Sequence, residues 1–149
     1  MTSEHDYQAH FSQETCPLCC DPSRGCELIG DLSITRAYLQ KSANFRGYCI
    51  LVLKHHAVEL DDLAAEERSA LIEDIARVAN AVRRVCNPVK LNYEILGNVV
   101  PHIHVHIIPR YQTDPAWDRA AWFALPDEET LPADEYEALA DGIRAAIRA

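Results

Sequence analysis

The sequence predicts an α+β fold in which one antiparallel β-sheet, arranged as a meander, carries two helices. The first observation behind this prediction is the order of the expected elements, β-β-β-α-β-β-α, with short connections between them. The second is a strict alternation of histidine with branched apolar residues inside 101–110, which is typical of a strand. The third is the helical period of apolar residues over 64–85 and over 132–148.

Length and composition indicate a single domain, which we take as residues 1–149. The chain has 149 residues, of which 48% are hydrophobic and 25% charged, as in ordinary globular proteins. The net charge is −9, from 23 acidic and 14 basic residues. This balance disfavours binding of polymeric nucleic acid, which needs many cationic contacts to phosphates. A small anionic ligand needs only a local pocket.

The first 15 residues are expected to form a loose N-terminus, and they contain no apolar segment typical of a signal peptide. No apolar run has the length of a transmembrane helix. We therefore expect a cytoplasmic protein without membrane contacts. In a reducing compartment, a close pair among the six cysteines favours metal or redox chemistry over disulfides.

Cys16 and Cys19 form a Cys-Pro-Leu-Cys motif. Two thiolates at this spacing can bind one tetrahedral zinc ion, but they supply only half of its ligands. A thioredoxin-like pair would open a helix after a strand, and the turn residues 21–25 that follow do not fit that context. Cysteines without a role are the third alternative, and these residues alone leave the choice open.

Strands are expected over 27–32, 35–41 and 48–53, with a turn at 44–47. The run 48–53 is continuously apolar and therefore indicates a strand at the centre of the sheet. It ends in Lys54-His55-His56, where a lone histidine would usually be solvated or structural.

Two helices are expected, and an irregular segment precedes the second. The helix over 64–85 has apolar residues at steps of four and three, acidic residues in its first turn and arginines in its last, and it stops at Asn87-Pro88. Between Arg110 and the C-terminal helix 132–148 we expect an irregular segment, 111–131. It contains Trp117 and Trp122, for which we favour a role as cover for the sheet or as a contact surface.

A strand over 91–96 leads through the turn signal Gly97-Asn98 into the histidine-rich strand 101–110. On a strand, alternate side chains share a face, so His102, His104 and His106 would form one row, roughly 6–7 Å apart. The intervening apolar residues would pack on the other face. A polar strand face and a crude metal site are the simpler interpretations of this row.

The row also permits phosphate chemistry. An imidazole can act at neutral pH as nucleophile, proton donor or metal ligand. Neighbours of a central nucleophilic histidine can donate hydrogen bonds to a phosphate oxygen or to the leaving group. The sequence has no glycine-rich phosphate loop, so imidazoles, amides and backbone N–H groups would have to hold any phosphate.

The segment His102-Ile-His104-Val-His106-Ile-Ile resembles the His-φ-His-φ-His-φ-φ signature of the histidine triad family of nucleotide hydrolases and transferases. The similarity extends over about residues 16–112, through the Cys-x-x-Cys motif, the strand ending at His56, the long helix and the Gly97-Asn98 approach. It implies a homodimer and cleavage of nucleoside phosphoramidates, dinucleoside polyphosphates or related nucleotide conjugates.

The resemblance also implies roles for single residues. His104 would attack the α-phosphorus and form a nucleotidyl-histidine intermediate that water resolves, and His106 would contact the phosphate or assist the leaving group. Gly97 would allow a close turn, and Asn98, where the family usually has glutamine, could bind phosphate. In zinc-bearing members the metal ligands match Cys16, Cys19, His56 and His102, which would complete a structural zinc site.

Departures from the family pattern leave functions other than hydrolysis as alternatives. Many members have histidine in place of Tyr48, and serine or threonine in place of Val99, which motivates a nucleotide-binding or interaction protein with little catalysis. The third triad position is His106 rather than glutamine, which favours hydrolysis. A diadenosine polyphosphate phosphorylase or a nucleotidyltransferase of the same family is the nearer alternative.

Overall fold

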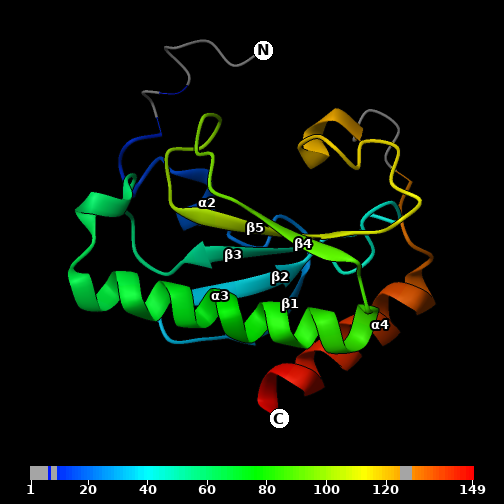
Figure 1. The fold of residues 1–149 in the computed structure, drawn as a ribbon. Coiled ribbons are helices and arrows are strands. Elements are labelled where there is room, and N and C mark those ends of the chain that lie inside the picture. Colours follow the sequence, from blue (N-terminus) through cyan, green and yellow to red (C-terminus); the bar gives the residue numbers. More distant parts are fainter. Residues whose placement is uncertain (1–6, 8–9, 125–128) are drawn as a thin grey trace.

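The computed structural model describes residues 7, 10–124 and 129–149, and it confirms the α+β fold. Two long helices, α3 (Ala65–Cys86) and α4 (Ala133–Arg148), pack against each other and cover one face of a five-stranded sheet (Figure 1). The strands are β1 (Glu27–Asp31), β2 (Thr35–Leu39), β3 (Cys49–Leu53), β4 (Lys90–Glu94) and β5 (His104–Arg110). Three short elements complete the description, namely α2 (Pro17–Cys20) and the 3₁₀ turns η1 (Leu60–Asp62) and η2 (Ala121–Ala124).

The strand order is β1-β2-β3-β5-β4, and every neighbouring pair is antiparallel. The meander therefore holds for β1 to β3, while β4 lies at the sheet edge and β5 lies between β3 and β4. Burial explains why β5, and not β4, lies beside β3. Six of the seven β5 residues are buried, whereas β4 buries only Leu91. A strand that is buried on both faces is best placed in the interior of the sheet.

The long helix agrees with its sequence pattern. It begins after Ala64, whose backbone N–H donates to the Glu67 carboxylate, and it ends at Asn87 in the left-handed conformation before Pro88. Its buried Asp74 accepts hydrogen bonds from the backbone of residues 33–35 and from the Thr35 hydroxyl. A carboxylate on α3 thus fixes the turn between β1 and β2.

The third helix was not expected. At the Cys-Pro-Leu-Cys motif, for which no helix was expected, residues Pro17–Cys20 form a single helical turn, so the described chain has three α-helices rather than two. Proline at the first helical position favours this turn, because its fixed φ suits the helix and its missing N–H is not needed there.

The sheet has two different faces. On the α3 and α4 side, Val105 and Ile107 belong to the main apolar core. The other face carries Tyr38 and Val52, which pack with Leu18 of α2 in a second, smaller cluster. This second face also bears the histidines of β5, so the fold separates a packed face from a functional one.

Two expected segments extend beyond the described residues. The loose start, 1–15, includes 1–6 and 8–9, and the irregular segment 111–131 includes 125–128; nothing is described of these residues or of the Trp122 side chain. Within 111–124, the buried Arg110 guanidinium donates to the backbone oxygens of Ala116 and Arg119, which ties this segment to β5. In the described part of the chain, no helix is both long and apolar enough to cross a membrane.

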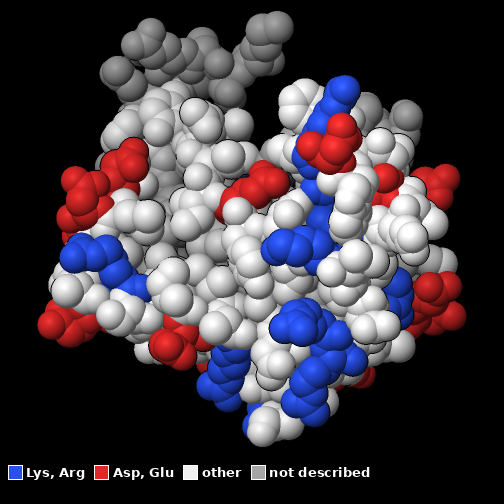
Figure 2. All heavy atoms as spheres, in the orientation of Figure 1, with Lys and Arg blue, Asp and Glu red and all other residues white. Residues whose placement is uncertain are grey.

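Charged side chains of both signs are spread over the visible surface. Figure 2 shows several lysines and arginines over the second half of α3 and over α4, with acidic side chains over the first half of α3 and elsewhere on the same face. The face drawn therefore presents a mixed surface rather than one continuous basic one.

Candidate active site and metal centre

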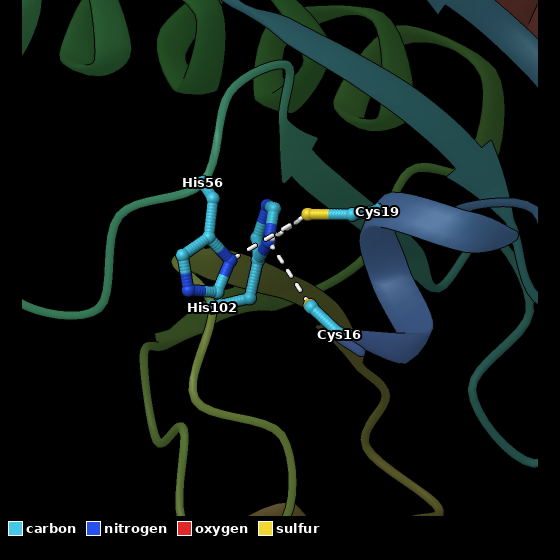
Figure 3. A group of neighbouring side chains, drawn as sticks. All are labelled: Cys16, Cys19, His56 and His102. Atoms are coloured by element: carbon cyan, nitrogen blue, oxygen red, sulfur yellow. Dashed lines mark hydrogen bonds between the residues drawn. The ribbon is translucent and has the colours of Figure 1, made fainter. Parts of the chain in front are cut away.

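Four side chains from three parts of the chain converge beside the sheet (Figure 3). Cys16 directly precedes α2 and Cys19 lies in it, His56 follows β3, and His102 precedes β5. The Nδ1 atom of His102 lies 3.4 Å from the sulfur of Cys16 and 3.4 Å from that of Cys19, and His56 Nδ1 lies 3.5 Å from the Cys19 sulfur. One ligand atom from each residue lies within 4.8 Å of all the others, so the four are positioned to bind a metal.

The spacing of the four atoms fits a tetrahedral ion. Bonds of about 2.3 Å to sulfur and about 2.0–2.1 Å to nitrogen, at tetrahedral angles, separate sulfur from nitrogen by about 3.6 Å. The sulfur–nitrogen distances of 3.4 and 3.5 Å agree with that separation. Two thiolates and two imidazoles are also a common donor set for structural zinc.

Backbone carbonyls orient both metal-site histidines. The Nε2–H of His102 donates to the Leu53 oxygen over 2.9 Å, and the Nε2–H of His56 donates to the Phe11 oxygen over 2.8 Å. A carbonyl can only accept, so each ring carries its proton on Nε2 and turns an unprotonated Nδ1 toward the sulfurs. Both histidines are therefore held in the tautomer that a metal requires.

The two cysteines lie three residues apart on one helical turn, which brings their sulfurs to the same side. Burial, followed by the hydrogen bond and charge of Cys16, raises the pKa of the Cys19 thiol to about 12. Two thiols this close ionise together only beside a positive charge, because the two thiolates repel each other. The pair is therefore suited to binding a metal cation.

The histidine row is divided by the structure. Strand β5 begins at His104, not at Pro101 as expected, and His102 precedes it with its ring in the metal cluster. The alternation extends over His104 and His106 only, whose ring centroids are 4.9 Å apart. His102 leaves the ladder because its ring reaches Cys16 and Cys19, while its backbone N–H donates to the Val100 oxygen in a tight turn.

The tautomer of His104 follows from its contact to the preceding turn. Its Nδ1–H donates to the carbonyl oxygen of His102 over 2.6 Å, so the lone pair lies on Nε2. Burial lowers the pKa of His104 below that of a free imidazole, which keeps the ring neutral at physiological pH. A neutral imidazole with an unprotonated Nε2 is the form that can act as a nucleophile.

His106 has a different partner. Its Nδ1 lies 2.6 Å from the hydroxyl of Tyr48, and both side chains are buried. Burial, and next the nearby His104, lower the pKa of His106 to about 4. Sequence reasoning treated Tyr48 only as a departure from the family pattern and missed this contact. The contact follows from the pairing of Cys49 with Ile107, which puts Tyr48 on the histidine face and which the sequence alone does not reveal.

A cavity of about 340 Å³ opens in front of these two histidines. It is formed by α2 and the turn after it, by β2 and β3, and by the loop before β5. Its lining residues are Leu18, Pro22, Ser23, Arg24, Tyr38, Gln40, Ile50, Val52, Val99, Val100, His104 and His106. Apolar side chains thus form most of the wall, and its polar groups come from the two imidazoles, Arg24, Ser23 and Gln40.

The Gly97–Asn98 approach has the expected turn. Gly97 has a φ of +73°, a left-handed conformation that side chains rarely adopt. From this loop Val99 and Val100 line the cavity, and Asn98 is exposed beside them. The role of Asn98 as a phosphate ligand stays a prediction.

Comparisons with known proteins agree with this geometry. A family model described as the HIT domain matches residues 24–113, which is more than half of the chain, so the chain belongs to the histidine triad (HIT) family. The match begins after Cys16 and Cys19. A histidine triad protein from Bradyrhizobium japonicum has the same fold, with a TM-score of 0.75 and 34% identity over 82% of this chain and 90% of that chain.

Two curated relatives carry names that describe an activity. The chain is 23% identical to an adenosine 5'-monophosphoramidase of Schizosaccharomyces pombe over 83% of this chain and 90% of that protein. It is 25% identical to an asymmetrical bis(5'-nucleosyl)-tetraphosphatase of the same yeast over 60% of this chain and 52% of that protein. The chain spans 64% of the length of two further HIT-like relatives. Nucleotide hydrolysis is thus represented among its relatives.

Proposed function

We propose that this protein hydrolyses a nucleotide conjugate at its α-phosphorus, with His104 as the nucleophile. The observation that carries the proposal is the hydrogen bond from His104 Nδ1–H to the His102 carbonyl, which leaves the Nε2 lone pair for attack. Burial keeps the ring neutral, and the same ring lines the cavity. A nucleophile that needs no prior deprotonation suits catalysis at neutral pH.

The reaction proceeds in two displacements. In the first, Nε2 of His104 bonds to the α-phosphorus as the bond to the leaving group breaks, giving a nucleotidyl-histidine, and a departing amine takes up a proton from solvent. In the second, water attacks the same phosphorus and loses a proton to solvent as the phosphorus–nitrogen bond breaks, releasing a nucleoside monophosphate and the neutral imidazole. His106 contacts the phosphoryl oxygens, where negative charge increases in each transition state.

The cavity supports a nucleoside as the common part of the substrate. Tyr38, Ile50 and Val52 offer an apolar and aromatic wall for a base, and Gln40 offers hydrogen-bonding groups for the sugar. The substrate is a nucleoside phosphoramidate or a dinucleoside polyphosphate. Arg24 favours the polyphosphate, because a guanidinium at this cavity complements additional phosphate groups.

We propose zinc as the ion of the Cys16, Cys19, His56 and His102 cluster. Bound there, a closed tetrahedral zinc ion supplies structure and no reacting ligand. The residues themselves join α2 to the chain after β3 and before β5. The site therefore holds the His102 carbonyl in the position where it orients His104.

We also propose a cytoplasmic homodimer that binds neither membranes nor polymeric nucleic acid. The dimer is supported by the open edge strand β4, around which Val89, Tyr93, Ile95 and Leu96 are exposed. An apolar sheet edge is a natural surface for pairing with a second copy.

The nucleophile is tested by His104→Ala. The variant should release nucleoside monophosphate at least about a thousandfold more slowly from a fluorogenic adenosine phosphoramidate and from diadenosine tetraphosphate. His55→Ala is the matched control, since His55 is exposed and lies outside the cavity, and its activity should equal that of the wild type.

Three outcomes separate the alternatives. Unchanged turnover in folded His104→Ala rejects the mechanism. Formation of nucleoside diphosphate only when phosphate is added identifies a phosphorylase. A wild-type protein that binds nucleotides and forms no nucleotidyl adduct detectable by mass spectrometry is a binding protein with little catalysis.

A further inference from the structure

Tyr48 lies directly behind the third histidine of the triad. Its hydroxyl oxygen is 2.6 Å from Nδ1 of His106, and the two side chains are 6% and 7% exposed. The ring of Tyr48 packs in a cluster with Phe45, Ile108 and Ala121, while His106 lines the cavity. Tyr48 therefore contacts the site through His106, from the side opposite the cavity.

The contact with Tyr48 bears on which ring nitrogen of His106 carries the proton. Because burial holds the pKa of the ring near 4, the ring is neutral at physiological pH and carries one proton. That proton lies on Nδ1 or on Nε2, and the partner of one nitrogen decides which. His104, with its proton on Nδ1, shows how a single neighbour makes this choice.

The chemistry of the pair favours one arrangement. A phenol is the stronger acid of the two neutral groups, and an imidazole nitrogen is the stronger base, so O–H donating to nitrogen is the better hydrogen bond. The distance of 2.6 Å agrees with a hydroxyl donor. A phenol that donates to Nδ1 requires this nitrogen to be unprotonated.

We propose that Tyr48 is a positioning residue, whose hydroxyl donates to Nδ1 of His106 and thereby keeps the ring proton on Nε2. The two histidines that line the cavity then have opposite tautomers. His104 offers an unprotonated Nε2 as nucleophile, and His106 offers Nε2–H as a donor. Resting on the proposed function, the donor binds a non-bridging oxygen of the phosphoryl group that His104 attacks, without transfer of its proton.

The test replaces Tyr48 with phenylalanine, which removes only the hydroxyl. In full-length, metal-loaded protein with ¹⁵N-labelled histidine, the wild-type His106 signals, assigned by comparison with His106→Asn, should report a proton on Nε2. In Tyr48→Phe the ring should become a mixture of tautomers. The kcat for nucleotide hydrolysis should fall roughly ten- to a hundredfold while KM stays within about twofold, because the donor acts mainly in the transition state.

Tyr136→Phe is the matched control. Tyr136 is also buried, and its hydroxyl donates to the Leu39 oxygen over 2.7 Å, in the core beneath α4. Loss of this hydroxyl should lower stability as much as loss of the Tyr48 hydroxyl. It should leave both the His106 tautomer and kcat unchanged, which separates positioning from a general structural effect.

The outcomes are distinguishable from failure of the proposed function. A wild-type His106 protonated on Nδ1, or the same tautomer in wild type and Tyr48→Phe, overturns the positioning role. A tautomer change on loss of the hydroxyl supports it, even where the wild type cleaves no nucleotide. In that last case the hydrolase proposal fails and the effect of Tyr48 on His106 stands.

Discussion

At the residue scale, the three histidines of one motif differ because the Nδ1 atom of each has a different neighbour. In His102 this nitrogen faces two sulfurs, in His104 it donates to a carbonyl, and in His106 it lies against a phenol. The neighbour fixes the tautomer, and in the proposed mechanism the tautomer fixes whether Nε2 attacks the phosphorus or donates a hydrogen bond. Identical side chains are thus separated by their partners.

Arg24 is the residue that we expect to select the substrate. It follows the turn that Asp21 stabilises by accepting hydrogen bonds from the backbone of Ser23 and Arg24. Arg24→Ala should raise the KM for diadenosine tetraphosphate roughly five- to tenfold, through loss of an ionic contact to the polyphosphate. Adenosine phosphoramidate, which has one phosphate, should be affected less than about twofold.

Steady-state kinetics with both substrates measures this difference, and Arg84→Ala on the exposed side of α3 serves as the control for loss of a positive charge. Equal changes in KM for the two substrates, or no change for the tetraphosphate, would contradict the assignment of Arg24.

At the scale of elements, the metal cluster links the shortest helix to two connections of the sheet. α2 alone is a single turn and has too few hydrogen bonds to persist in isolation. Its position depends on Leu18, which packs with Tyr38 and Val52, and on the cysteines that face His56 and His102. Because α2 also forms one wall of the cavity, the cysteine–histidine cluster and the cavity share one element.

Cys19→Ala should therefore abolish metal binding and lower the melting temperature by roughly 10 °C, which corresponds to a few kcal/mol for a domain of this size. Elemental analysis should find about one zinc per chain in the wild type and none in the variant. Cys20→Ala is a close control, because Cys20 is the next residue, is exposed and lies outside the cluster. If Cys19→Ala retained its zinc, the ligand set would be wrong.

At the scale of the whole molecule, one face of the sheet is covered by helices, and one edge of the sheet is exposed. The helices α3 and α4 cover one face, and β4 lies at one end of the sheet, where no other described strand pairs with its outer edge (Figure 1). Tyr93 on this strand is 49% exposed, and Val89 at its start is 62% exposed. Exposed apolar groups at a sheet edge would be covered by a second copy of the chain.

A charge at this edge should separate the copies. Sedimentation velocity should give the wild type twice the mass of one chain and should give Tyr93→Glu the mass of a single chain, because burying a carboxylate opposes pairing. Phe123→Glu introduces the same charge at another exposed aromatic residue and should stay dimeric. A monomeric wild type, or a dimeric Tyr93→Glu, would exclude β4 as the interface.

The sequence by itself determined the class of the fold, the extent of the long helices and the Cys-Pro-Leu-Cys pair as half of a possible metal site. These features depend on periodicity and on residue types at short spacing, which are local properties of the chain. The ligand set of Cys16, Cys19, His56 and His102 came from the family resemblance, and the structure brings those four together.

Only the tertiary structure decided the strand order, the start of β5 at His104 and the partner of His106. Each depends on which segments meet, and Tyr48 and His106 are 58 residues apart in the chain. Pairing between distant strands is set by burial of whole faces. The fold can therefore bring a residue that departs from the family pattern into contact with a residue of the histidine motif. Tyr48 is the example. From the sequence it is only a departure from the histidine that many family members have, whereas in the structure its hydroxyl contacts Nδ1 of His106.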